Sequence, residues 1–341
     1  MTGPLASLQP TRRQMMAGLA ALPLVGLACG AASATTQVLD AARRFGRLHG
    51  LVVAVDGETV LAEAVRGASL DRPVNVKSVS KSIIAALTGI AIARGVFTGT
   101  DQKIAALLPD ALPDRPDPRL QAITLDHLLT MRAGLERTSG PNYGGWVQSA
   151  DWVRNALARP FVAEPGERFL YSTASFHLLS AALTRASGRS TLDLARDWLG
   201  VPLDIAVPPW TQDPQGIYMG GNNMALTPVA MLRFGETYRR GGTFDGVQVM
   251  PEAWVRESWT PRTRSPFSGD LYGYGWFLTE IAGQPVRYAR GYGGQMIYVV
   301  PQLRLTAAIT SDPTRPARSA GYVGDLHSFL ADHLMALARD S

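Results

Sequence analysis

The residues best suited to chemistry in this sequence are Ser78 and Lys81, which lie three positions apart in Ser78-Val79-Ser80-Lys81. At the start of a helix this spacing places the serine hydroxyl and the lysine amine on one face, one turn apart. A lysine that is desolvated against an apolar helix can lose its proton and activate the hydroxyl, whereas an arginine cannot. Only three of the 33 basic residues are lysines, so a lysine at this place favours a titratable amine. The spacing predicts a serine nucleophile with a lysine base, although the same short pattern also occurs at ordinary solvated helix starts.

The elements that must position this pair follow from hydrophobic periodicity and turn residues. Residues 38–48 suit an amphipathic helix, residues 51–55 and 60–65 suit the strands of a hairpin, and residues 78–94 suit a strongly apolar, buried helix. Residues 101–261 predict mainly helices separated by Gly and Pro. After them the sequence predicts four strands and a final helix, at residues 274–278, 286–290, 295–300, 303–310 and 321–338.

Strands near both ends of the chain, with helices between them, predict the fold class. We expect an α/β (α+β) architecture in which an antiparallel sheet built from both chain ends is flanked by helices. A mainly helical subdomain would be inserted at about residues 101–261. The 341 residues, of which 46% are hydrophobic, are enough for one sizeable core.

The N-terminus has the features of an export signal. Arg12-Arg13 precedes an apolar run over residues 15–28, and Ala32-Ser33-Ala34 forms the small-x-small pattern that signal peptidase cleaves. The apolar run is shorter than the roughly 20 residues that a membrane span needs. We therefore expect residues 1–34 to be a twin-arginine type signal, and residues 35–341 to be a periplasmic or secreted domain without a transmembrane span.

Cys29 is the only cysteine and lies inside this signal, where its lipidation would be an alternative to cleavage. Cleavage would leave a mature chain without a thiol, which excludes disulfides, thiol catalysis and cysteine metal sites. His127 and His177 lie singly on apolar helices and are expected to be packed residues, so the sequence predicts neither a metal site nor another cofactor. The formal charge of +5 is spread without basic runs, which argues against nucleic acid as a partner. The sequence leaves the oligomeric state open.

Five motifs occur in the order found in one family of hydrolases. They are Ser78-Val79-Ser80-Lys81-Ser82, residues 123–135, Tyr171-Ser172-Thr173, Leu226-Thr227-Pro228 with the helix to Gly235, and Gly291-Tyr292-Gly293-Gly294-Gln295. On these motifs the chain resembles the class C β-lactamase-like serine hydrolases, which include class C β-lactamases, D-Ala-D-Ala carboxypeptidases, esterases and 6-aminohexanoate-oligomer hydrolases. The resemblance covers nearly all of the expected mature chain and implies a β-lactamase/transpeptidase-like fold.

The resemblance also implies roles for the matching residues. Ser78 would be acylated, Lys81 would take its proton, and Tyr171 would relay a proton to the leaving group and help to activate water. The backbone N–H groups of Ser78 and Gln295 would form the oxyanion hole, the latter on an edge strand after two glycines. The expected reaction is hydrolysis of a small-molecule ester or amide through a covalent acyl-enzyme.

Two departures from the family pattern bear on the substrate. Thr173 replaces an asparagine, so a single hydroxyl stands where the family has an amide. Tyr292-Gly293-Gly294 replaces Lys-Thr-Gly, which removes the cation that would face a substrate carboxylate. Both changes favour an esterase or amidase with a less anionic substrate. The alternatives are a β-lactamase or D-Ala-D-Ala carboxypeptidase, a 6-aminohexanoate-oligomer hydrolase, and a non-catalytic acyl-ligand receptor, and the intact Ser78, Lys81 and Tyr171 argue against the receptor.

A further group of residues is expected to line the substrate pocket, because this part of the family carries specificity. These residues are Thr173, Tyr292, Gly293, Gly294, Tyr143, Trp210, Asp213 and Asn222, with Asn223 beside them. Asp213 would pair with a substrate ammonium if the substrate were a 6-aminohexanoate-type amide. Aromatic and Asn-rich loops also occur as simple turns, so these residues are weaker candidates than the motifs.

Overall fold

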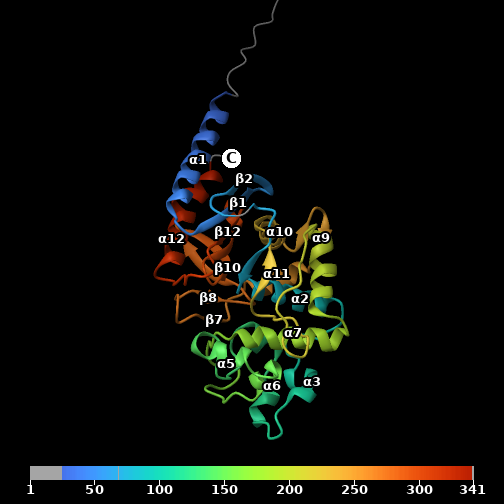
Figure 1. The fold of residues 1–341 in the computed structure, drawn as a ribbon. Helices are drawn as coiled ribbons and strands as arrows, with labels where there is room; N and C mark the ends of the chain where they lie inside the picture. Colours follow the sequence, from blue (N-terminus) through green and yellow to red (C-terminus); the bar gives the residue numbers. More distant parts are fainter. Residues whose placement is uncertain (1–24, 68, 340–341) are drawn as a thin grey trace, which may run out of the picture.

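The computed structural model describes residues 25–67 and 69–339 of the chain (Figure 1). Residues 1–24, which hold the expected twin-arginine motif, lie outside the described residues. The described chain begins in helix α1 (Val25–Arg44), which includes the last part of the expected signal and the first part of the first expected helix. This helix ends earlier than expected because the first strand already begins at Leu48.

An eight-stranded antiparallel sheet forms the centre of the fold, in the order β2-β1-β12-β11-β10-β9-β8-β7. Its strands are β1 (Leu48–Val55), β2 (Glu58–Ala64), β7 (Thr263–Arg264), β8 (Leu271–Tyr272), β9 (Phe277–Ile281), β10 (Gln284–Gly291), β11 (Gln295–Val300) and β12 (Leu305–Ser311). Strand β1 pairs along its length with β12, and β12 pairs with β11. The two ends of the chain therefore meet inside one sheet, which confirms the expected fold class.

Helices cover both faces of the sheet, and this explains why its central strands are buried along their whole length. Every residue of β11 and β12 is buried, as in strands covered on both sides. On one face lie α1 and α12 (Tyr322–Phe329) (Figure 1). There Phe45, which directly follows α1, packs edge-on against two aromatic rings of α12. On the other lies α10 (Pro228–Arg239), which approaches so closely that a Cβ on Gly235 would lie 2.7 Å from side chains of β11 and β12.

The middle of the chain is mainly helical, as the fold prediction expects. Its helices are α3 (Ile104–Leu107), α4 (Leu125–Leu129), α5 (Tyr143–Val147), α6 (Trp152–Leu157), α7 (Thr173–Ser187), α8 (Thr191–Ala195), α9 (Val201–Leu203), α10 and α11 (Glu252–Ser258). Two strand pairs outside the large sheet differ from the expectation, namely β3 (Val74–Lys77) with β4 (Met224–Leu226), and β5 (Thr243–Phe244) with β6 (Val247–Gln248). These strands are too short for a period of two to show in the sequence.

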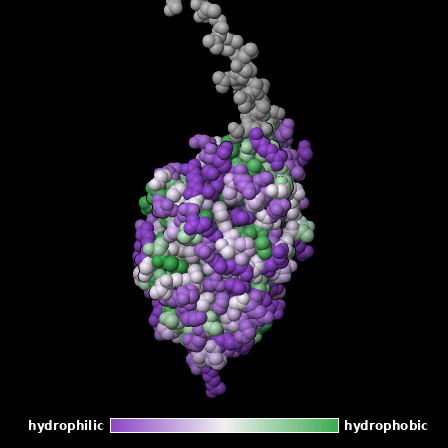
Figure 2. Space-filling model, turned by 180° about the vertical axis from the view of Figure 1, so that it is seen from behind, coloured by the Kyte–Doolittle hydropathy of each residue, from purple (hydrophilic) through white to green (hydrophobic). Residues whose placement is uncertain are grey.

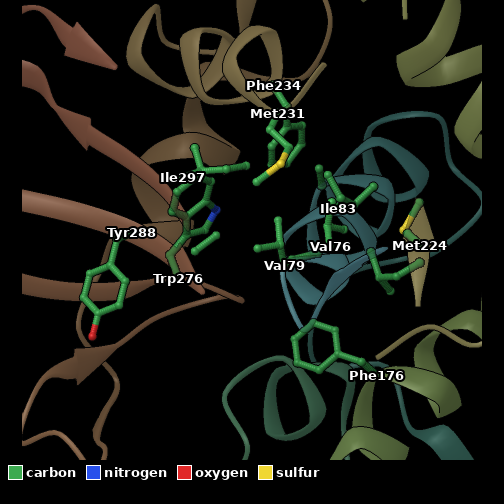
Figure 3. Close-up of a cluster of buried hydrophobic side chains, with 14 of the residues drawn as sticks. Val76, Val79, Ile83, Phe176, Met224, Met231, Phe234, Trp276, Tyr288 and Ile297 are labelled. Carbon is green, nitrogen blue, oxygen red and sulfur yellow. The ribbon is translucent and has the colours of Figure 1, made fainter. Parts of the chain in front are cut away.

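Helix α2 (Ser80–Ala93) links the sheet to the helical part of the chain. It is buried from its first residue to Ala91, which confirms its expected burial. Figure 3 shows Val79 and Ile83, at the start of this helix, inside a cluster that includes Phe176 of α7 and Met231 of α10. The start of α2 is therefore held by side chains from several elements, and Ser78 directly precedes it.

The face of the molecule shown in Figure 2 is predominantly hydrophilic, with small hydrophobic areas between polar ones. Large hydrophobic side chains that are exposed include Val201, Phe267 and Tyr292. Within residues 25–67 and 69–339, no helix combines the length and the apolar character that crossing a membrane would require.

Candidate active site

Ser78 lies in the turn that joins β3 to α2, and polar side chains hold the backbone there. Lys77, the last residue of β3, has a φ of 53°, a left-handed conformation that non-glycine residues rarely adopt. Asn75 Oδ1 accepts a hydrogen bond from the Lys77 N–H at 2.9 Å, and Ser80 Oγ donates to the Lys77 carbonyl at 2.6 Å. This sharp turn leaves Ser78 half-buried, so its hydroxyl stands at the junction of a strand and a buried helix.

Lys81 is buried on the first turn of α2, beside the serine. Its Nζ lies 2.9 Å from Ser78 Oγ and 2.5 Å from the carbonyl oxygen of Gly221, and the residue is 1% exposed. Burial lowers the pKa of the Lys81 amine, while charge and hydrogen-bond interactions with Tyr171 oppose that shift. Desolvation is the larger effect, so Lys81 gives up its proton more readily than an exposed lysine, as a general base requires.

Tyr171 joins this pair from a third segment of the chain. It lies half-buried two residues before α7, and its ring centroid is 4.8 Å from Lys81 Nζ. The backbone beside it is fixed, because the Leu170 N–H donates to the Met131 carbonyl at 2.7 Å. The structure therefore brings together Ser78, Lys81 and Tyr171, the three side chains in which the sequence predicts catalysis.

A backbone carbonyl that sequence reasoning missed also belongs to the site. Gly220 and Gly221 end a loop that packs directly on the N-terminal turns of α7. A Cβ on Gly221 would lie 2.4 Å from the Thr173 carbonyl oxygen, and one on Gly220 would lie 2.0 Å from that of Phe176. Only glycine allows this approach, which brings the Gly221 carbonyl to Lys81. The two adjacent glycines were the one signal in the sequence for such a contact.

The end of β10 passes beside the residues that precede Ser78. A Cβ on Gly291 would lie 2.3 Å from the Val76 carbonyl oxygen, so only glycine fits there. The ladder between β9 and β10 stops at Tyr288, which leaves residues 289–291 of β10 without a paired strand on that side. The open stretch of sheet edge next to the serine therefore belongs to β10.

Gln295 is placed differently from the expectation. It begins β11, which lies between β10 and β12 and is not an edge strand. Its side-chain amide donates to the Ser311 carbonyl at 2.6 Å and accepts from the Ser311 N–H at 3.1 Å. The edge-strand prediction was wrong because Gly293 and Gly294, with φ values of 91° and 97°, form the turn of the β10–β11 hairpin. Gln295 thus ties the start of β11 to the end of β12.

Two backbone N–H groups near Ser78 have no acceptor among the described residues. In the described part of the chain, neither the Ser78 N–H nor the Tyr292 N–H donates a hydrogen bond. Tyr292 directly follows Gly291 and opens the hairpin turn, with the residue 50% exposed. Unpaired backbone donors beside a serine nucleophile are what a developing oxyanion requires.

Two of the expected pocket residues meet close to the Lys81 acceptor. Asn222 directly follows Gly221, and its amide donates to the Tyr143 hydroxyl at 3.2 Å. The Oδ1 atom of Asn222 is buried and has no hydrogen-bond partner among the described atoms. Thr173 is buried, and its hydroxyl shares a hydrogen bond with Ser139 Oγ at 2.9 Å. Tyr143 and Asn222 therefore stay candidates for substrate contact, while the Thr173 hydroxyl is engaged inside the protein.

Trp210 and Asp213 point into the protein. Trp210 is 9% exposed, and its Nε1 donates to the Met219 carbonyl at 2.9 Å. The side chain of Asp213 has no exposed surface, and its Oδ2 lies 3.0 Å from His177 Nε2. The expected contact of Asp213 with a substrate ammonium was wrong, because an ammonium could not reach this carboxylate. His177, whose side chain is equally enclosed, is the packed residue that the sequence predicts.

His127 has a structural role at the start of α4. Its Nδ1 accepts from the Thr124 N–H at 3.3 Å, and its own N–H donates to Thr124 Oγ1 at 3.2 Å, so the two residues form a capping box. Burial lowers the pKa of the His127 imidazole. Among residues 25–67 and 69–339, no group of three or more His, Cys, Asp or Glu side chains is placed to hold a metal ion.

Comparison with known proteins places the chain in a family. Residues 36–328 match the family model described as Beta-lactamase. The fimbrial assembly protein FimD (serogroup H1) of Dichelobacter nodosus is 34% identical over 125 residues, which are 36% of this chain and 31% of that protein. The matched segment thus spans less than a third of that curated relative.

Solved structures share the fold at low sequence identity. A Bacillus anthracis protein described as a 6-aminohexanoate-dimer hydrolase has a TM-score of 0.72 and 16% identity, covering 89% of this chain and 81% of that one. EstCE1, described as a hydrolase with promiscuous acyltransferase activity, has a TM-score of 0.70 and 19% identity, covering 90% of this chain and 98% of that one. Because the family model spans most of the chain, the protein belongs to the β-lactamase family of serine hydrolases.

Proposed function

We propose that this protein cleaves an ester or amide bond through a covalent acyl-enzyme on Ser78. The observation that carries the proposal is the 2.9 Å contact between Ser78 Oγ and the buried Lys81 Nζ. A hydroxyl at hydrogen-bond distance from a desolvated amine is the arrangement that activates a weak nucleophile. Lys81 is therefore assigned as the general base, and Tyr171 as the proton relay.

In acylation, Ser78 Oγ attacks the substrate carbonyl carbon while its proton moves to the neutral Lys81 amine. The Gly221 carbonyl accepts one Lys81 N–H, so in the neutral amine the lone pair of Nζ would be available to the serine hydroxyl. The oxygen that becomes negative would be held by the N–H groups of Ser78 and Tyr292, which have no acceptor among the described residues. The Tyr292 N–H is proposed for this role instead of the Gln295 N–H because Gln295 begins an inner strand. One such donor typically contributes about 3 kcal/mol to transition-state stabilisation.

Tyr171 supplies the proton path to the leaving group. Its ring contacts Lys81, so the proton taken from Ser78 can pass from the lysine through the phenol to the departing alcohol or amine. Water then attacks the acyl-enzyme and gives a proton to the Lys81 and Tyr171 pair. That proton returns to Ser78 Oγ as the acid leaves, and each group regains its starting state.

The surroundings of the site support a less anionic ester or amide as the substrate class. Tyr292, in place of the lysine of Lys-Thr-Gly, offers no cation to a substrate carboxylate. The Thr173 hydroxyl is engaged by Ser139, and the enclosed Asp213 offers no anchor to an ammonium. The activities described for EstCE1 and for the Bacillus anthracis protein, acyl transfer and hydrolysis of an aminohexanoate dimer, also support a linear ester or amide.

We also propose that residues 1–34 are an export signal and that residues 35–341 work in the periplasm or outside the cell. Support comes from Arg12-Arg13 and Ala32-Ser33-Ala34 in the sequence. N-terminal sequencing of the exported protein is expected to begin at Thr35. An uncleaved chain that stays in the cytoplasm would contradict this proposal.

The reaction is tested by hydrolysis of p-nitrophenyl butyrate and of a chromogenic cephalosporin by the full chain and two variants. We expect ester turnover, little cephalosporin turnover, and a loss of ester activity of about 10³-fold or more in Ser78→Ala. Ser328→Ala, an exposed serine on α12, is the matched control and should keep full activity. Ester activity that survives in Ser78→Ala would refute the nucleophile, and rapid cephalosporin turnover would refute the substrate class.

A further inference from the structure

A histidine–aspartate pair is fully buried between α7 and the loop that precedes β4. His177 on α7 and Asp213 in the loop before β4 have no exposed side-chain surface, and His177 Nε2 lies 3.0 Å from Asp213 Oδ2. The rings of Trp146 and Trp152 pack edge-on against the imidazole, with centroid distances of 5.6 and 5.5 Å. Substrate therefore cannot touch either residue, and any effect of the pair on the reaction must pass through another group.

The contacts around the pair favour one tautomer of His177. Asp213 Oδ1 accepts the N–H groups of Gln215 and Ile217 at 2.9 and 2.8 Å, and Oδ2 faces His177. His177 Nδ1 is buried without a partner among the described atoms. An N–H at that position would be a buried donor without an acceptor, which is costly. The tautomer with its proton on Nε2 therefore suits the pocket, and it donates that proton to Asp213 Oδ2.

The His177–Asp213 hydrogen bond is one of several contacts between α7 and the loop of residues 213–221. The Tyr218 carbonyl accepts from Ser180 Oγ of α7 at 2.6 Å, and Gly220 and Gly221 pack on the α7 backbone. The α7 residues in these contacts have the spacing of one helix face, and they are residues 173, 176, 177 and 180. The loop therefore follows α7 from its middle to its start, where it meets the catalytic site.

The far end of this loop holds the catalytic lysine, because the Gly221 carbonyl accepts from Lys81 Nζ. We propose that His177 and Asp213 are positioning residues that act on Lys81 through the loop. They keep the Gly221 carbonyl where it orients the lysine amine toward Ser78 and shields it from water. This inference rests on the proposed function, since it takes Lys81 as the base.

If His177 served only in packing, position 177 would need a different kind of side chain from the one that a hydrogen-bond role needs. A hydrogen-bond role needs an N–H donor at the Nε2 position, whereas a place between two tryptophan rings favours an aromatic ring. His177→Gln places an amide N–H near the former Nε2 but loses the ring. His177→Phe keeps a ring but loses the donor. If the hydrogen bond matters, His177→Gln should be more active than His177→Phe. If only packing matters, the order should be reversed.

The experiment measures kcat, KM and the pH dependence of kcat/KM for p-nitrophenyl butyrate, with thermal unfolding in parallel. The full chain is compared with His177→Gln, His177→Phe and Asp213→Asn, and Asp197→Asn, which breaks an exposed ion pair, is the control. We expect kcat to fall about 100-fold in His177→Phe, the effect of a small misplacement of a catalytic group. His177→Gln should keep kcat within about tenfold of the wild type, and KM should change little in both.

The pH profile gives a readout that packing would not move. Burial is the main cause of the lowered pKa of Lys81, and Tyr171 is the titratable group that opposes it. A displaced loop lets water reach the amine, so its pKa rises toward the ordinary value. The acid limb of kcat/KM should therefore move to higher pH in His177→Phe and in Asp213→Asn, and stay in place in Asp197→Asn.

The inference would be overturned if a folded His177→Phe had wild-type kcat and an unmoved acid limb. It would also be overturned if His177→Phe were more active than His177→Gln. In either case the role of His177 would be packing. If His177→Phe does not fold, kcat and the acid limb of Asp213→Asn test the inference by the same criteria, because asparagine keeps the shape of the aspartate side chain. Absence of Ser78-dependent hydrolysis in the wild type would contradict the proposed function instead, so the two failures are distinct.

Discussion

Replacing Lys81 with methionine removes the amine but keeps an unbranched side chain of similar length. The variant loses the 2.9 Å contact with Ser78 Oγ and leaves the Gly221 carbonyl without its partner. Loss of a general base typically lowers the rate by about 10²–10⁴-fold. A loss of about 10³-fold in kcat/KM, the middle of that range, corresponds to about 4 kcal/mol of transition-state free energy.

The same substitution has a smaller effect on folding, with a defined pH dependence. An unpaired Gly221 carbonyl costs about 1–3 kcal/mol, but the variant no longer buries an amine, which offsets part of that cost. Burial lowers the folded-state pKa of Lys81 below its ordinary 10.5. Between these two pKa values the unfolded wild type binds more protons than the folded one, so its stability rises with pH. The wild type should therefore gain stability relative to Lys81→Met as the pH rises toward 10.5.

The assay combines steady-state hydrolysis of p-nitrophenyl butyrate with urea unfolding of the wild type and Lys81→Met at neutral and alkaline pH. Lys81→Arg, which keeps the charge but cannot take up a proton, should be as inactive as Lys81→Met. A folded Lys81→Met with kcat/KM within about tenfold of the wild type would refute the assignment of the lysine as base.

Tyr171→Phe keeps the ring but removes the phenol, so kcat should fall about 10²-fold with little change in the unfolding midpoint; wild-type kcat would refute the relay. Gly291→Val places a Cβ 2.3 Å from the Val76 carbonyl oxygen, so it should lower both Tm and kcat/KM, whereas Gly46→Ala, with open space around it, should change neither. Burial lowers the pKa of His327 from 6.5 to about 4, so stability is fully present above pH 6.5 and declines as the pH falls toward 4. Urea unfolding should show a smaller decline in His327→Gln, and an equal decline would contradict this reasoning.

The proximity of Ser78 and Lys81 was predictable because they lie one helical turn apart, where spacing alone sets the geometry. Tyr171 lies far from them in the sequence, and only the order of motifs in a related family identified it. The sheet built from both chain ends was likewise predictable, because its central strands are apolar over most of their length. These features depend on local pattern or on motif order, and the sequence shows both.

The remaining parts of the site depend on long-range packing. The Gly221 carbonyl is a backbone group, so no residue type marks it as the partner of Lys81. Asp213 was assigned to a substrate because nothing in the sequence near it reveals His177, with which it is buried. Gln295 was placed on an edge strand because the two preceding glycines suit both an exposed strand and a hairpin turn, and only the pairing of β10 with β11 decides between them.

The central claim, a covalent acyl-enzyme on Ser78, is tested most directly by intact-mass spectrometry of the full chain quenched in acid during turnover of p-nitrophenyl butyrate. We predict a species heavier by one butyryl group, mapped by peptide analysis to Ser78 and absent from Ser78→Ala. An unmodified protein throughout turnover, or an adduct on another residue, would contradict the proposed mechanism.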